Sequence, residues 1–400
     1  MHTPAAGQPD APRRQLALFA VGLRPFYALA GLFAFLAIPI WVANYVGLLR
    51  FDGYLISLFW HQHEMIFGFA VAVIAGFLLT AVRNWTGRAT PTGGGLATLA
   101  LVWLLARILA LTGPAWPAAI VDLAFLPLLA VTIAIPIWRS QNRRNIKLLF
   151  VLAALTVANL VFHLAYNGVL PMQLTATSVS SALDIILILI AIMGGRVIPA
   201  FTANAVPAAR PRRFLALEVV AIGSLLLVLA ADVLAPAYRL PASVLAALYF
   251  VAALAHATRL WLWEPQLTIK NPLLLMLPMA YAWVPVTLLL RGLVPLDLAP
   301  STAAAHALTL GAMTSLMLAM MMRSALGHTG RPLVAGIPEL LAFFLMQTAA
   351  IVRVLATLIN LEHYRFYIIL SALIWTLAFA GFLWRYVPML VYPRIDGKPG

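Results

Sequence analysis

The stretch that decides the fold is Trp60–Gly87, which reads WHQHEMIFGFAVAVIAGFLLTAVRNWTG. It opens with His61, His63 and Glu64 and continues as an apolar segment long enough to cross a bilayer as a helix. Ionisable side chains at the mouth of a membrane span are costly, so they indicate a functional site. Because imidazole binds metals readily, the stretch predicts a metal-bearing helix in a polytopic membrane protein.

The composition of the whole chain agrees with a membrane protein. Hydrophobic residues make up 64% of the 400 residues and charged residues 10%, which is more apolar surface than a soluble domain covers. The sequence predicts an all-α fold with a polar tail over 1–23, one transmembrane domain over 24–388 and a second tail over 389–400. Apolar runs recur throughout, and the twelve expected helices lie at about 24–48, 61–83, 94–112, 116–138, 146–168, 177–199, 213–234, 240–262, 272–291, 300–323, 337–358 and 366–388.

Basic residues and the absence of cysteine narrow the class further. Most of the 26 Lys and Arg residues fall on the side of the N-terminus, and the positive-inside rule then puts both termini in the cytoplasm. The net charge of +14 faces anionic lipid on that side, so it is no argument for a nucleic-acid partner. Without cysteine, the chain cannot hold a thiolate haem, a c-type haem or a cysteine-ligated iron–sulfur cluster. Any haem must be bound non-covalently, most naturally by histidine.

Four histidines from three distant helices reach one depth near the outer surface in this topology. His61 and His63 begin the second span, His163 lies near the end of the fifth, and His306 lies near the start of the tenth. This convergence predicts that they are metal ligands, although they could instead be helix-end residues that meet water or lipid headgroups. On a regular helix, His61 and His63 point about 200° apart. Each could therefore serve a different centre, or only one of them is a ligand.

Further ionisable residues lie in the outer halves of the spans. Glu64 and Asp184 are candidates for proton supply, and Asp184 could instead pair with Arg107 or Arg353. The two arginines could alternatively bind the propionates of a haem, because a guanidinium matches a carboxylate. Asp122 could contribute to the same region or could be a helix-end charge in water.

Two groups of side chains share helix faces with the candidate ligand histidines. His306 shares its helix face with three methionines that end at Met320. Methionine sulfur can ligate Cu(I), so a copper site is conceivable, but methionine more often fills gaps in a core. On the fifth span, Asn159 or Asn167 could orient the neighbouring imidazole through a hydrogen bond, or could link helices.

Four motifs carry a resemblance that covers nearly the whole chain. They are WHQHEMIFGFAVAVIAGFLLTAVRNWTG at 60–87, NLVFHLA at 159–165, GGRVIPAFTANA at 194–205 and HALTLGAMTSLMLAMMMRSALGHTGRPL at 306–333. Together they resemble the NnrS family of bacterial inner-membrane proteins. The resemblance implies a multi-pass protein with haem b and copper, linked to nitric oxide, nitrosative stress and denitrification. The family is expected to have a histidine just before the stretch 281–283 of the ninth span, where this chain has none, so its site must differ if that histidine is a ligand.

Three functions are open at this point. The leading hypothesis is a haem protein that reduces two nitric oxide molecules to N2O, with His61, His63, His163 and His306 as ligands of a haem and of a second haem or copper. Because the chain shows no electron-transfer domain, such a reductase needs an external electron donor. The second hypothesis is a nitric oxide sensor or metal-handling protein with the same ligands and no turnover. The third is a transporter of a small solute or a metal.

Overall fold

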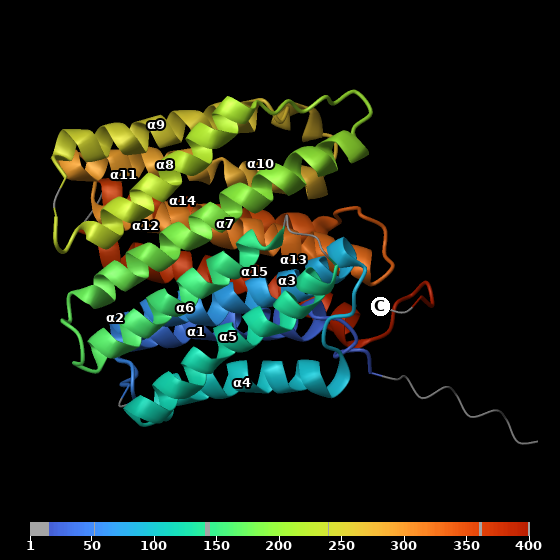
Figure 1. Cartoon of the computed structure of the whole chain (residues 1–400), viewed down its shortest axis with the longest axis horizontal. Coiled ribbons are helices and arrows are strands. Elements are labelled where there is room, and N and C mark those ends of the chain that lie inside the picture. Colours follow the sequence, from blue (N-terminus) through green and yellow to red (C-terminus); the bar gives the residue numbers. More distant parts are fainter. Residues whose placement is uncertain (1–15, 52, 141–144, 239, 360–361, 399–400) are drawn as a thin grey trace, which may run out of the picture.

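The computed structural model describes residues 16–51, 53–140, 145–238, 240–359 and 362–398. Within these ranges the chain is helical without strands, and twelve segments are long and apolar enough to cross a membrane (Figure 1). The predicted all-α polytopic fold is therefore confirmed. The spans are α1 (Leu23–Tyr45), α2–η1–α3 (Ser57–Thr86), α4 (Gly93–Thr112), α5 (Ala115–Arg139), α6 (Lys147–Tyr166), α7 (Leu174–Ala205), α8 (Leu215–Leu234), α9 (Ala242–Trp261), α10–α11–η4 (Pro272–Leu296), α12–η5–α13 (Ser301–His328), α14 (Ile337–Ile359) and α15 (Tyr364–Val391).

The sixth span is longer at its C-terminal end than the sequence predicts. The glycines and the proline of 194–199 predict a helix end there, but α7 continues to Ala205. The glycines serve close packing instead. A Cβ at Gly194 would lie 2.9 Å from Cε2 of Tyr281, and one at Gly195 would lie 1.9 Å from Nη2 of Arg259. Neighbouring helices thus stabilise a segment whose local sequence favours termination.

The helices form two packed groups that meet at α7. On one side, α1 packs against α3 and α15, α14 packs against α15, and the series α4, α5 and α6 leads to α7. On the other side, α8 packs against α7 and α9, and α9 packs against α11 (Figure 1). The centre of the bundle is apolar, and the side chains that face outward along the spans are mostly large and apolar, as a lipid environment requires.

Two of the spans contain π-helical turns immediately after histidines. The π-helix η1 covers Glu64–Ala70 and follows His63, and η5 covers Ala307–Thr314 and follows His306. Within and after η5, the Thr314 and Ser315 hydroxyls donate to carbonyls five residues earlier, which satisfies part of the widened turn. Because π-helical turns are rare and recur at functional sites, they mark the histidine-bearing ends of both spans.

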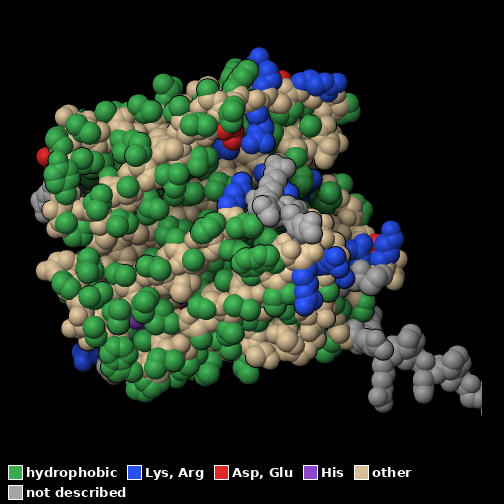
Figure 2. Space-filling model, in the orientation of Figure 1, with side chains coloured by type: hydrophobic (Ala, Val, Ile, Leu, Met, Phe, Trp, Pro, Cys, Tyr) green, Lys and Arg blue, Asp and Glu red, His purple; other side chains and the backbone are tan. Residues whose placement is uncertain are grey.

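Most of the basic side chains and the four candidate ligand histidines lie toward opposite ends of the molecule. On the face shown in Figure 2, most Lys and Arg side chains gather toward the end where the C-terminus lies. The histidine-bearing helices α2 and α12 begin at the other end (Figure 1). The predicted common depth of the histidines is thus confirmed within the molecule, and the cytoplasmic placement of the basic end stays a prediction from the positive-inside rule.

Candidate metal centre

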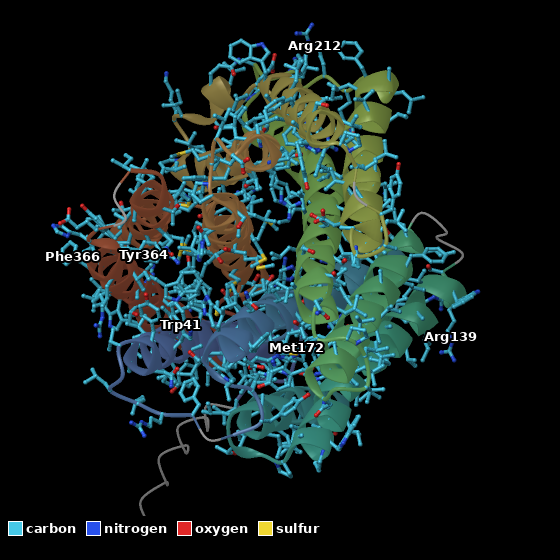
Figure 3. The ribbon with its side chains drawn as sticks, turned by 90° about the vertical axis from the view of Figure 1, so that its left-hand side faces the viewer. Trp41, Arg139, Met172, Arg212, Tyr364 and Phe366 are labelled. Carbon is cyan, nitrogen blue, oxygen red and sulfur yellow. The ribbon has the colours of Figure 1, made fainter. Side chains whose placement is uncertain are left out.

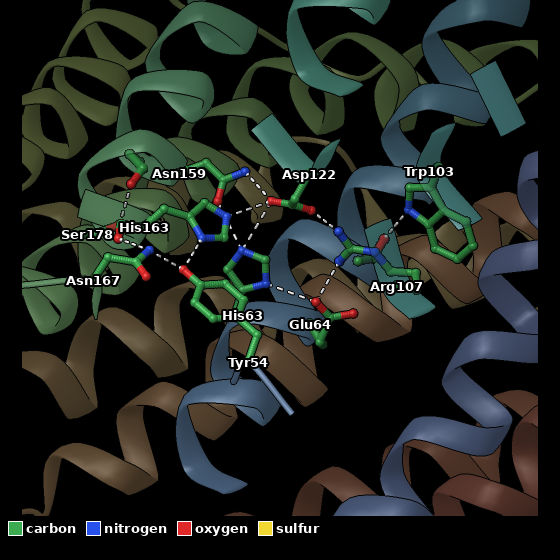
Figure 4. Close-up of polar contacts among 12 residues, drawn as sticks. Tyr54, His63, Glu64, Trp103, Arg107, Asp122, Asn159, His163, Asn167 and Ser178 are labelled. Atoms are coloured by element: carbon green, nitrogen blue, oxygen red, sulfur yellow. Dashed lines mark hydrogen bonds and ion pairs between the residues drawn. The ribbon is translucent and has the colours of Figure 1, made fainter. Parts of the chain in front are cut away.

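A buried polar cluster lies between α2, η1, α4, α5 and α6 (Figure 4). His63, Asp122 and His163 can each offer a ligand atom such that these atoms lie within 4.8 Å of one another. The Nε2 atoms of His63 and His163 lie 3.3 and 3.0 Å from the same oxygen, Oδ2 of Asp122. Two imidazoles and one carboxylate are a donor set for iron, copper or zinc. These three residues are therefore a candidate metal centre.

Arg107 holds the carboxylates of this cluster in place. Its Nη1 donates to Oε1 of Glu64 at 2.8 Å, and its Nη2 donates to Oδ1 of Asp122. All three side chains are buried. A buried ion pair is stable only when its charges are matched and hydrogen-bonded, because each charge has lost its hydration. Arg107 is thus engaged with two carboxylates of the protein, and its predicted contact with a haem propionate stays a prediction.

His63 is hydrogen-bonded at both of its ring nitrogens. Nδ1 of His63 lies 2.9 Å from Oε1 of Glu64, and Nε2 lies 3.0 Å from Oδ1 of Asn159. The Asn159 amide is oriented by its Nδ2, which donates to Asp122. Both nitrogens of His63 thus face oxygen atoms, those of Glu64 and Asn159, which fixes the orientation of the ring.

Tyr54, in the loop before α2, orients the second imidazole. Its hydroxyl lies 2.9 Å from Nδ1 of His163, and Nδ2 of Asn167 donates to the same hydroxyl at 2.7 Å. Burial raises the pKa of Tyr54 to about 12, so the phenol stays protonated at neutral pH. Its hydrogen then points to Nδ1, and Nε2–H of His163 donates to Asp122. A metal ion at this place would replace the protons that now link the imidazoles to Asp122.

The loop that carries Tyr54 gives a first testable prediction. Leu55 N–H donates to the carbonyl of Ala110 at 3.2 Å, and a Cβ at Gly53 would lie 1.8 Å from the carbonyl oxygen of Leu111. Gly53→Ala must push the loop off α4, and we expect it to lower the free energy of unfolding by about 1–3 kcal/mol. Thermal unfolding in detergent measures this change. Gly94→Ala is the control because nothing lies within 4 Å of its Cβ, and equal unfolding temperatures for the two variants would contradict the prediction.

His61 and His306 form a second group on the other side of α2. The His61 ring stacks on Trp41 of α1 with ring centres 4.1 Å apart, and its buried Nδ1 has no hydrogen-bond partner among the described residues. Nδ1 of His306 donates to the carbonyl of Thr302 at 2.7 Å, which leaves Nε2 as a free ligand atom. The two imidazoles lie within electrostatic range of each other and of Arg353. Nδ1 of His61 and Nε2 of His306 are thus available as ligand atoms near the guanidinium of Arg353.

Arg353 projects from α14 toward the same end of the molecule. Its Nη1 donates to the hydroxyl of Tyr364 at 2.8 Å. Figure 3 views this end and shows Tyr364 and Trp41, which mark the α15 and α1 sides of the second group. A guanidinium has five donor hydrogens, and the bond to Tyr364 uses one of them. Arg353 therefore retains donors for the carboxylate of a ligand.

The structure sorts the four predicted ligands into two pairs. His61 and His63 face opposite sides of α2, as the helix repeat predicts, and their roles as ligands stay a prediction. His63 meets His163, with ring centres 4.9 Å apart, and His61 lies near His306. Glu64 lies at the first pair, where it contacts His63.

Asp184 requires a correction. Its carboxylate pairs with Arg291 of α11 and not with Arg107 or Arg353, so the pairing considered from the sequence is wrong. Arg291 lies near the outer end of its span, where the sequence indicates a residue that faces water. Its long side chain turns inward instead, because the buried carboxylate of Asp184 offers a partner that compensates the lost hydration. Asp184 lies outside both histidine groups.

Three features of the site are only weakly marked in the sequence. Asp122, taken as a possible helix-end charge, lies at the centre of the first group. Tyr54 carried no motif, and its only signal was an aromatic hydroxyl in the short loop before the histidines. Asn159 does orient an imidazole, as predicted, but the ring belongs to His63 of another helix. The methionine stripe lies by an apolar cavity of about 110 Å³, with Met320 in its lining, which is typical of core packing.

The fold and the site together define a polytopic membrane protein with a buried histidine–carboxylate group that could bind a metal. The family described as NnrS protein matches residues 17–394, so the chain belongs to the NnrS family. Membership links it to the nitric oxide response. No curated protein shows significant similarity to the chain.

Proposed function

We propose that this protein binds haem b at His61 and His306 and a second metal, copper or iron, at His63, His163 and Asp122, and that it reduces nitric oxide. Two NO, two electrons and two protons give N2O and one water, and the electrons come from an external donor. When bound, a haem and a neighbouring metal supply redox-active positions at which nitric oxide binds and accepts electrons. The observation that carries the proposal is the division of the four histidines by one helix, α2, into two adjacent pairs.

The second histidine group fits a haem. His61 has a buried nitrogen without a partner, which costs free energy unless a ligand engages that imidazole. His306 is held by Thr302 in the tautomer that leaves Nε2 free. Arg353 has spare donors for a propionate. An arginine beside two imidazoles suits a haem better than a bare cation, because the arginine charge would repel the cation.

The first group fits a metal ion better than a haem. All four imidazole nitrogens of His63 and His163 are already hydrogen-bonded in a packed cluster, and two of them converge on one carboxylate oxygen. Nitrogen and oxygen donors of this kind suit iron or copper. Glu64, Arg107 and Asn159 would keep the ligands oriented. Loss of such a supporting hydrogen bond typically lowers the metal affinity about 10–100-fold.

Glu64 is the candidate for proton supply in this proposal. Its Oε1 bonds to His63 and Arg107, while its buried Oε2 has no partner among the described residues. Glu64→Gln keeps the size and most of the hydrogen bonds but cannot exchange a proton. We expect turnover to fall by about 10²-fold or more, with the haem spectrum and its response to NO retained. Glu362→Gln, at an exposed position, is the control, and unchanged N2O formation by Glu64→Gln would remove Glu64 from the mechanism.

The placement of the site supports a role at the outer face of a bacterial cytoplasmic membrane. Both histidine groups lie at the end away from the basic residues, which we place on the periplasmic side. There, nitric oxide and a periplasmic or membrane-bound electron donor reach the site without crossing the bilayer. Consumption of nitric oxide at this place would protect the cell against nitrosative stress.

One experiment tests the proposal against its two rivals. The purified protein is examined by optical spectroscopy after air oxidation, after dithionite and after exposure to NO, with metal analysis of the same sample. N2O is then measured by gas chromatography with NO and a reductant supplied. Haem bands that shift with NO, together with N2O, support the reductase. A shift without N2O favours a sensor or metal-handling protein, and a colourless, folded protein that takes up a solute into proteoliposomes favours a transporter.

A further inference from the structure

A second buried polar cluster lies among α7, α8, α9 and α11, away from both histidine groups. Asp184 of α7 pairs with Arg291 of α11. Asp232 of α8 and Tyr249 of α9 lie close enough to this pair to interact with it electrostatically. The guanidinium of Arg291 is 5.9 Å from the centre of the Tyr249 ring. These four residues are the titratable and charged groups that face one another from the four helices of the described structure.

The charges of this cluster do not balance without a further positive charge. Two carboxylates face one guanidinium, and the Asp184 side chain is only 1% exposed. Its Oδ2 is buried and has no hydrogen-bond donor among the described residues. Two neighbouring carboxylates that share one guanidinium repel each other, and the buried Asp184 is not hydrated, so the pair favours holding a proton. A proton shared between them, or a small cation, would satisfy the orphaned oxygen.

A cavity borders Asp232 and opens to the outside. It has a volume of about 720 Å³, and Asp232 is among its lining residues together with Gln173, Thr177 and Tyr238. Gln173 and Tyr238 are exposed, so the cavity opens at the end of the molecule that carries the histidines. On the inner side of Asp232, the next turn of α8 presents the fully buried Val228. Water can therefore reach Asp232 from the outer end, whereas apolar packing adjoins Asp232 on the other side.

We propose that Asp184 and Asp232 form a proton-binding site that holds one shared proton and is loaded from this cavity. Arg291 neutralises the charge that remains on the pair, and Tyr249 lies beside it. The proton adds to the oxygen of one carboxylate, no other bond changes, and its source is water in the cavity. The site lies apart from the metal ligands and gives the protein a second, independent place that takes up a proton from the outer side.

The proposal predicts the sign of a pH effect. In the unfolded chain both aspartates are ionised at neutral pH, whereas the folded protein keeps one proton on the pair. The folded state thus binds more protons, so its stability falls as the pH rises and the shared proton is lost. Asp232→Asn supplies a neutral hydrogen-bonding group in place of the protonated acid. We expect this variant to fold and to lose that dependence on pH.

Infrared difference spectroscopy of the full-length protein between pH steps tests the site directly. The wild type is expected to show a protonated-carboxyl band at neutral pH that disappears at higher pH, and Asp232→Asn is expected to abolish it. Asp184→Asn should also abolish the band. If Asp184→Asn does not fold, the result for Asp232→Asn decides the test. Asp297→Asn, at an exposed position in the loop after α11, is the control and should keep the band.

Two outcomes would overturn the proposal. A band that persists unchanged in both aspartate variants must come from another carboxyl group. Absence of the band in the wild type, together with a carboxylate signal that changes when sodium replaces choline at constant ionic strength, would mean that a cation balances the pair instead of a proton.

Discussion

Arg107→Met is expected to lower the free energy of unfolding by about 3–5 kcal/mol, because it leaves buried carboxylates without their cation. Glu64 and Asp122 both accept hydrogen bonds from Arg107, and both are at most 3% exposed. Methionine fills a similar volume, so the effect reports charge rather than a cavity. Chemical or thermal unfolding in detergent measures the change.

Two further variants show whether charge is the cause. Adding Asp122→Asn to Arg107→Met removes one of the stranded charges and should restore part of the loss. Arg213→Met is the matched control, because Arg213 pairs with Glu218 while its side chain is 45% exposed. Such a surface pair contributes about 0–1 kcal/mol. If Arg107→Met were as stable as the control, the cluster would not depend on this ion pair.

Substitution of the histidines is expected to separate the two proposed centres. His61→Ala and His306→Ala should remove the haem absorbance while the content of the second metal is kept. His163→Ala and Asp122→Asn should do the reverse. Loss of a direct ligand should weaken binding by more than the roughly 10–100-fold that loss of a supporting hydrogen bond costs. Optical spectra and metal analysis of the same purified samples measure both centres.

The exposed His363 provides the control for these variants. His363→Ala should retain both haem and metal, and size-exclusion profiles show which variants still fold. If His63→Ala removed the haem and His306→Ala did not, the two centres would be exchanged between the histidine pairs. Full retention of haem in all four single histidine variants would refute histidine ligation altogether.

Much of the fold follows from the sequence alone. A run of about twenty apolar residues has to form a helix in a bilayer, because every backbone polar group must be satisfied within the segment. Twelve such runs thus determine twelve spans, as found. The common depth of His61, His63, His163 and His306 follows from their positions along those spans. The opposite directions of His61 and His63 follow from the helix repeat.

Only the tertiary structure decided which helices are neighbours and hence which residues meet. His63 could have faced any helix, and its contact with α6 makes His163 and Asn159 its partners. Lipid-facing and helix-facing positions are both apolar, so the sequence carries little information about helix pairing in a membrane. For the same reason the sequence left Asp122 as a possible helix-end charge, whereas the structure places it at the centre of the site.

The partner of Asp184 shows the same limit most clearly. The sequence shows a buried carboxylate that needs a positive charge, and this much was determined without a structure. It offered several arginines at similar depth, and the choice among them depends on distances of a few ångströms across the bundle. The packing of α11 against α9, next to α7 and α8, brings Arg291 and Asp232 to Asp184. The sequence of a membrane protein determines the depth of its polar groups in the bilayer. Only helix packing determines where these groups lie in the plane of the membrane.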